Sequence, residues 1–204
     1  MGNGWFARKL ICFGRIFVLD LFKFNSMKNI LYLILLFSFT SVAQGKYITR
    51  SGIIGFEASV PAFEEVKAKS NAATAIINTD NGEFAALVLV KSFRFKNALM
   101  EEHFNENYAE SGQFPKATFK GNVSGLDLNS DRTSYTISGK LTFHGITKAL
   151  EDISLKISKS DGKIIITGEF VSKASDYNIE IPKIVSNKIA QDVVVSFEFN
   201  LEKQ

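Results

Sequence analysis

Few side chains in this sequence could do chemistry. The two histidines are His103 and His144, and the only cysteine is Cys12. His103 and Glu106 are three positions apart, so on a helix they would share a face and could hold a metal ion if His144 lay nearby. Two independent histidines at the surface or rim are the simpler interpretation. The sequence contains no Gly-x-Ser-x-Gly elbow, phosphate loop or dinucleotide fingerprint, so we expect no enzyme, no cofactor and no metal site.

Phenylalanine is the unusual residue of the composition, with 19 copies against 5 tyrosines and 1 tryptophan. Many of these rings stand at positions expected to face the protein interior. They would either pack a solid core or, if the fold is a small barrel, line a space for one apolar ligand. The candidate lining residues are Phe93, Phe95, Phe104, Tyr108, Phe114, Phe119, Ile137, Leu141, Phe143, Phe170 and Phe197. Phe199 is also expected to face the interior.

A period of two dominates the sequence after Gln44, which is typical of strands with one buried and one solvated face. It is clearest over residues 193–201, 135–143 and 153–157. Weaker strands are predicted at 47–60, 63–70, 72–78, 84–95, 117–124 and 163–172. Turn residues at Asp80-Asn81-Gly82 and Asp161-Gly162 separate several of them.

One segment departs from this period. From Asn97 to Glu110, Met100, Phe104 and Tyr108 recur every four residues, which predicts a short amphipathic helix. Asn97 is the expected N-cap of this helix.

Many short strands of alternating polarity imply an all-β sandwich or closed barrel. Gly121, Gly139 and Gly168 fall inside predicted strands, and inward glycines permit strong bends and leave interior space. These glycines favour the barrel.

The net charge of +3 belongs to the first 43 residues, which carry five basic side chains and one acidic one. The remaining residues carry 19 basic and 20 acidic side chains, so we expect no nucleic-acid partner. Residues 27–43 are predicted to form a signal peptide, because Lys28 is followed by an apolar run and then by Ser41-Val42-Ala43 before the expected cleavage site. The apolar run is short for a membrane span, so none is expected in the mature form.

Residues 1–26 fit neither a signal nor a domain, and we interpret them as an over-called extension upstream of a start at Met27. An unusually long leader or a membrane-retained N-terminus is the alternative. The mature domain is then 44–204, periplasmic or extracellular and free of cysteine. No clear dimerisation patch is visible, and an oligomer stays possible.

Four segments occur in an order that resembles a known family. They are Phe114–Phe119, Gly139–Lys148, the helical stretch Met100–Tyr108 and Ser175–Ile179. Together they resemble the YceI-like family, as a divergent branch, from about Tyr47 to the C-terminus. The resemblance implies an eight-stranded antiparallel, lipocalin-like barrel with one short helix. It also implies a ligand with a long isoprenoid chain and a polar head.

We therefore expect a secreted or periplasmic binder of an amphiphilic, isoprenoid-like lipid. A solid-cored interaction or stress-related domain without a small ligand is the alternative. A polar head would stay at the barrel mouth, where the candidate contacts by position are Arg94, His103, Lys140 and Lys148.

Overall fold

A computed structural model describes residues 45–61 and 63–204; the expected extension (1–26) and signal peptide (27–43) lie outside this part. The elements are described in chain order. The strands are β1 (Lys46–Ser59), β2 (Lys67–Asn78), β3 (Glu83–Leu89), β4 (Arg94–Phe95), β5 (Lys116–Val123), β6 (Ser134–Phe143), β7 (Ile146–Ser160), β8 (Lys163–Lys173) and β9 (Ile189–Lys203). The helical elements are η1 (Val90–Ser92), α2 (Ala98–His103), η2 (Phe104–Tyr108) and η3 (Ala174–Tyr177).

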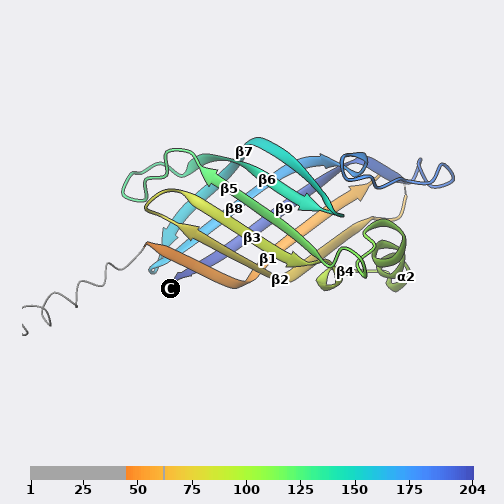
Figure 1. Ribbon diagram of the computed structural model, residues 1–204, viewed down its shortest axis with the longest axis horizontal. Helices are drawn as coiled ribbons and strands as arrows, with labels where there is room; N and C mark the ends of the chain where they lie inside the picture. The colour runs from red at the N-terminus through yellow and green to blue at the C-terminus, as the bar shows by residue number, and fades with distance from the viewer. Residues whose placement is uncertain (1–44, 62) are drawn as a thin grey trace, which may run out of the picture. The chain divides into compact units, whose positions relative to one another are not determined.

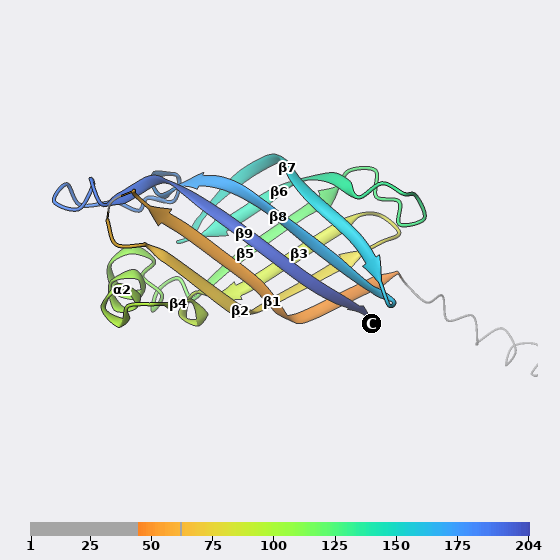
Figure 2. The same ribbon diagram turned by 180° about the vertical axis from the view of Figure 1, so that it is seen from behind.

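The long strands form a closed antiparallel barrel (Figures 1 and 2). Neighbours follow the order β1-β9-β8-β7-β6-β5-β3-β2, and the pairing of β1 with β2 closes the ring. The two-residue β4 only extends β2 at its start, where Ala68 is opposite Phe95. Within the described residues the barrel therefore has eight strands, as the family resemblance implied.

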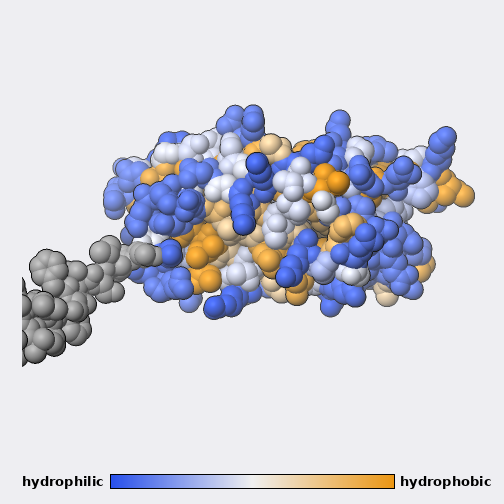
Figure 3. Space-filling view, viewed as in Figure 1, coloured by the Kyte–Doolittle hydropathy of each residue, from blue (hydrophilic) through white to orange (hydrophobic). Residues whose placement is uncertain are grey.

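The alternation of polarity explains which face of each strand is buried. On β9, Phe199 and Leu201 are buried, whereas Glu198, Asn200 and Glu202 are exposed. The outer surface in Figure 3 is accordingly mainly hydrophilic, with hydrophobic residues in smaller patches. Because alternation places one face of every strand inside, closing the ring gathers the apolar side chains around one axis.

Two predicted element boundaries are wrong. The strands expected at 63–70 and 72–78 are one strand, β2, whose register against β1 is irregular near Gly52. The strand expected at 84–95 breaks at the 3-10 turn η1. There the Ser92 hydroxyl donates to the Leu89 carbonyl oxygen at 2.6 Å and lies 2.7 Å from the Ser70 hydroxyl. These side-chain hydrogen bonds take the place of the interstrand backbone hydrogen bonds that would continue the strand.

The predicted helix is present as α2 followed by the π-helical turn η2. Asn97 is its N-cap, since its side-chain oxygen accepts hydrogen bonds from the amides of Leu99 and Met100. The helix stands at one end of the barrel (Figure 1). The centroid of the Phe104 ring there lies 5.1 Å from that of Phe56 and 5.3 Å from that of Phe95.

The barrel interior is packed at one end. Its side chains of lowest exposure include Ile77, Ile164 and Leu201, each 0% exposed, which lie near the ends of β2 and β9 and the start of β8. Tyr135 closes this end, because its hydroxyl donates to the Asp127 carbonyl oxygen at 2.7 Å and its ring lies 4.6 Å beneath Arg132. This half of the barrel is a conventional solid core.

The glycines inside strands mark close approaches. Gly121 and Gly139 are opposite each other on β5 and β6. A Cβ built on Gly139 would lie 2.6 Å from the Gly121 Cα and 2.7 Å from the Phe119 ring. The paired glycines let the Phe119 ring lie across the sheet at this point.

Gly139→Ala should therefore destabilise the protein by about 1–3 kcal/mol, the usual range for overpacking. Gly112→Ala is the matched control, because a Cβ there meets no atom within 4 Å. Urea unfolding of both variants measures the difference. Equal stability of the two would contradict the close approach.

Candidate ligand-binding cavity

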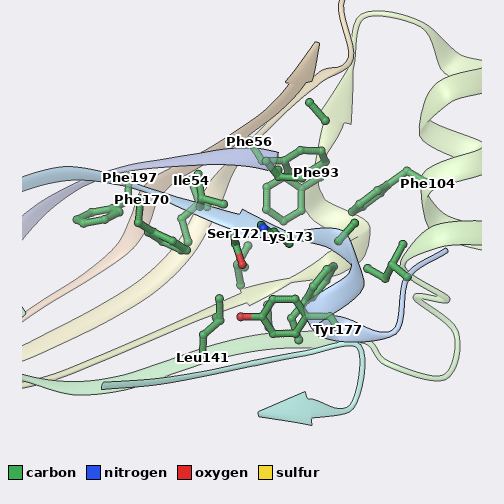
Figure 4. Close-up of a pocket in the computed structure, with 18 of the residues that line it drawn as sticks. Ile54, Phe56, Phe93, Phe104, Leu141, Phe170, Ser172, Lys173, Tyr177 and Phe197 are labelled. Atoms are coloured by element: carbon green, nitrogen blue, oxygen red, sulfur yellow. The ribbon is translucent and has the colours of Figure 1, made fainter. Parts of the chain in front are cut away.

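The other half of the barrel interior holds a cavity of about 550 Å³. This volume is within the usual range of small-molecule sites, roughly 300–1,000 Å³. Its floor includes Phe84, Ile166 and Phe199, which also belong to the packed core. The wall is overwhelmingly apolar, and Figure 4 shows the aromatic side chains that project into it from several strands.

A cluster of four phenylalanine rings forms the wall below the helix. Phe56, Phe93, Phe95 and Phe104 come from β1, from the segment around β4 and from η2. Phe56 is the centre of the cluster, with centroids 5.3 Å from Phe93 and 5.7 Å from Phe95 in tilted and edge-on arrangements. Such tilted and edge-on contacts are the favoured aromatic geometry. The cluster therefore forms a well-packed wall on this side of the cavity.

A second pair of rings lies deeper. Phe197 stacks on Phe199 at 5.6 Å, and Phe199 also contacts Phe84 at 5.6 Å. Phe197 lies over Gly168, its partner across β8 and β9, where a Cβ would come within 2.5 Å of the ring. The glycine leaves room for this ring to lie flat against the barrel wall.

The structure brings ten of the eleven predicted lining residues together around this cavity. They are Phe93, Phe95, Phe104, Tyr108, Phe119, Ile137, Leu141, Phe143, Phe170 and Phe197. Phe114 lies elsewhere: its ring is edge-on to His144, at 4.6 Å, and lies against Gly145. Phe114 precedes β5 and packs on the β6–β7 turn. Because it lies outside a strand, the alternation of side chains does not predict which way its ring points.

Of the four predicted head-group contacts, His103 lies on the cavity wall, where it is solvent-exposed. Arg94 is exposed and donates to Glu101 at 2.8 Å. Lys140 and Lys148 are exposed and lie outside the lining, on the solvated positions of β6 and β7. The structure therefore places none of these three residues in the cavity lining, and their contact with a head group stays a prediction.

Sequence reasoning missed several lining residues. Ile54, Phe56 and Ala58 alternate along β1, so their period of two could have identified them. The segment after β8 was not assigned to the site, yet it supplies lining residues before β9 begins: Tyr177, Ile179, Ile181 and Val185. Its irregular backbone carries no periodic signal.

Tyr177 is held in place by contacts outside the cavity. The His144 ring donates through Nδ1 to the Tyr177 carbonyl oxygen at 2.7 Å, and its Nε2 lies 3.0 Å from a Glu110 carboxylate oxygen. Both ring nitrogens lie within hydrogen-bond distance of oxygen atoms, and these two contacts fix the orientation of the ring. His144 is less exposed than a free surface histidine, since only 12% of its side chain is exposed.

His144→Ala should destabilise the protein by about 2 kcal/mol, since it removes two hydrogen bonds and the contact with Phe114. The exposed His103 supplies the control variant, His103→Ala, for which we expect a change within about 0.5 kcal/mol. Chemical denaturation of the two proteins measures the difference. An unchanged free energy of unfolding for His144→Ala would show that the hydrogen bond from His144 to the Tyr177 carbonyl oxygen does not hold η3 in place.

Within residues 45–61 and 63–204, no group of three or more histidine, cysteine, aspartate or glutamate side chains is placed to hold a metal ion. In the same part of the chain, no helix is long and apolar enough to cross a membrane.

A closed eight-stranded antiparallel barrel with a short helix at one end and an apolar interior cavity defines the lipocalin-type class of barrel. Within that class, the sequence model of the YceI-like domain family matches residues 48–201 of this chain. The chain therefore belongs to the YceI-like family. No curated protein sequence matches the chain.

Solved structures share the fold at low sequence identity. A polyisoprenoid binding domain from Saccharophagus degradans, implicated in plant cell wall breakdown, has 17% identity and a TM-score of 0.67, over 79% of this chain and 99% of its own. BcnA of Burkholderia cenocepacia has 14% identity and a TM-score of 0.63, over 74% and 95%. The YCEI protein of Campylobacter jejuni has 16% identity and a TM-score of 0.55, over 71% and 90%. These matches establish the fold, and the match of the family model to residues 48–201 confirms the predicted family.

Proposed function

We propose that the protein is a secreted or periplasmic carrier of an amphiphilic lipid with a long apolar chain, isoprenoid chains ahead of fatty acyl chains. The observation that carries the proposal is the cavity of about 550 Å³ walled by aromatic and aliphatic side chains. A solid-cored interaction domain would have filled this space with side chains. The similar Saccharophagus degradans domain is described as polyisoprenoid binding, which supports the same ligand class.

The driving force for such binding is the removal of the chain from water. Each methylene group that enters an apolar site contributes about 0.8 kcal/mol. Phe170, Leu141 and Phe197 offer the surface that would receive it (Figure 4). Binding of this kind needs no catalytic group, and we propose a binding protein and not an enzyme.

The sequence that precedes the barrel supports the proposed location independently of the cavity. The sequence of residues 27–43 has the organisation of a signal peptide with cleavage after Ala43. A carrier outside the cytoplasm would move a water-insoluble chain between surfaces. Sequencing the N-terminus of the protein from the periplasm or medium should yield a peptide starting at Gln44; a cytoplasmic protein starting at Met1 or Met27 would contradict this part of the proposal.

Native mass spectrometry of the purified 44–204 form, followed by solvent extraction, tests the ligand. We expect an added mass that extraction identifies as a lipid with an isoprenoid or acyl chain. The delipidated protein should then take up added polyprenyl lipid in equimolar amount. A clean apo mass together with no uptake of either lipid class would overturn the carrier proposal.

A further inference from the structure

Four hydroxyl-bearing side chains interrupt the apolar wall of the cavity: Tyr108, Thr118, Ser172 and Tyr177. Ser172 and Tyr177 both line it, and Figure 4 shows both side chains pointing into the space. Tyr177 is only 3% exposed. Its hydroxyl oxygen accepts or donates no hydrogen bond that meets the distance and angle limits among the described residues. The other buried side-chain atom of this kind there is Oδ1 of Asn105, which lies outside the cavity lining.

A second tyrosine of equal burial shows what is unusual about Tyr177. Tyr135, also 3% exposed, donates its hydroxyl hydrogen to the Asp127 carbonyl oxygen at 2.7 Å. A buried hydroxyl without a partner is costly, and phenylalanine would fill the same space without that cost. A carbonyl partner of this kind is missing at Tyr177, whose hydroxyl instead lies beside that of Ser172.

The direction of this hydroxyl is set by rigid contacts. The main chain of Tyr177 is held by His144, and its ring lies edge-on to Phe143 at 5.7 Å. Ser172 shares the inward face of β8 with Phe170, two residues earlier. Both hydroxyls are thus presented by ordered elements, which is the usual property of a recognition site.

The buried polar groups of the cavity are uncharged. The ionisable side chains among its lining residues, apart from the tyrosines, are Glu64, His103, Lys173 and Lys188, and all four are solvent-exposed. Burial raises the pKa of Tyr177; hydrogen bonding by the adjacent Ser172 hydroxyl lowers it by less, and the charge of Asp176 raises it further. The phenol therefore stays neutral and can donate its hydrogen. A charged head group beside these hydroxyls would lose part of its hydration, because the charged side chains of the lining are themselves solvent-exposed.

We propose that Tyr177 and Ser172 form a polar subsite inside the cavity that hydrogen-bonds an uncharged oxygen of the ligand, a hydroxyl or a carbonyl. The polar end of the ligand then lies beside the end of β8 and η3, at the end of the cavity opposite the packed core around Ile164 and Leu201. This inference rests on the proposed carrier function and specifies the head group that the carrier prefers.

The test compares three probes with the same isoprenoid chain: geranylgeraniol, geranylgeranyl diphosphate and the corresponding hydrocarbon without a head group. Affinity is measured on delipidated 44–204 by displacement of the uncharged dye N-phenyl-naphthylamine. For the unaltered protein we expect the alcohol to bind more tightly than both the diphosphate and the hydrocarbon.

Tyr177→Phe should weaken geranylgeraniol binding about fivefold, the value of one hydrogen bond, and leave hydrocarbon binding unchanged. Ser172→Ala, which alters a different element, should act in the same direction. The matched control is Tyr135→Phe, which loses its bond to Asp127 and should lower the urea midpoint without changing the affinity for any probe.

The outcomes separate the two proposals. If Tyr177→Phe and Ser172→Ala leave the affinities for the alcohol and for the hydrocarbon unchanged, the polar subsite is overturned and the carrier proposal stands. Tighter binding of the diphosphate than of the alcohol would also overturn it. Failure of the unaltered protein to bind any of the three probes would overturn the carrier proposal and the subsite with it.

Discussion

Ala86→Trp is expected to weaken lipid binding by about 100-fold while the barrel stays folded. Ala86 lies on the cavity wall, on the inward face of β3 between Phe84 and Val88. An indole there would occupy space that the ligand chain needs. Exclusion of about four methylene groups costs roughly 3 kcal/mol, which corresponds to about two powers of ten in affinity.

The neighbouring Ala85 provides the control, because it lies outside the cavity lining and the strand turns its side chain to the opposite face. Ala85→Trp should bind lipid as the unaltered protein does. Titration with geranylgeraniol and circular dichroism of both variants complete the comparison. Full binding by a folded Ala86→Trp would mean that the ligand, if any, lies somewhere other than this cavity.

Leu201→Ala is expected to cost about 3 kcal/mol of unfolding free energy, and Leu141→Ala only about 1 kcal/mol. Leu201 is 0% exposed in the packed half of the barrel, opposite Ile164 on β8, so its truncation leaves a hole that neighbours cannot fill. Leu141 is half-buried on the cavity wall, where truncation only enlarges a space that already exists.

Urea unfolding of the delipidated protein measures both values under the same conditions. The two substitutions remove the same atoms, so the difference reports the packing around each site. Equal losses would show that the interior is uniformly packed, which would favour the solid-cored interaction domain over the carrier.

The alternation of side chains made much of the cavity wall predictable. On β6, Ile137, Leu141 and Phe143 were expected inside and line the cavity, because strand direction is a local property of period two. The same alternation puts Lys140 on the solvated face, and it could have excluded that residue from the head-group set. The N-cap at Asn97 was equally local and was predicted correctly.

Residues outside regular strands could not be placed in this way. Phe114 was expected in the cavity but packs on His144, because its direction depends on a turn distant in sequence. Tyr177 lies in a 3-10 turn that ends at Asn178 with φ 56°, and no periodicity indicates where such a side chain points. Its unpartnered hydroxyl is visible only after three separate segments meet.

The sequence by itself determined the strand faces, the helix with its cap and the family, because each depends on neighbours along the chain or on ordered motifs. Only the tertiary structure decided that one half of the barrel is solid around Leu201 and the other hollow around Phe197. That division depends on the summed volumes of side chains from eight strands. Those side chains meet only when β1 pairs with β2 and the barrel closes.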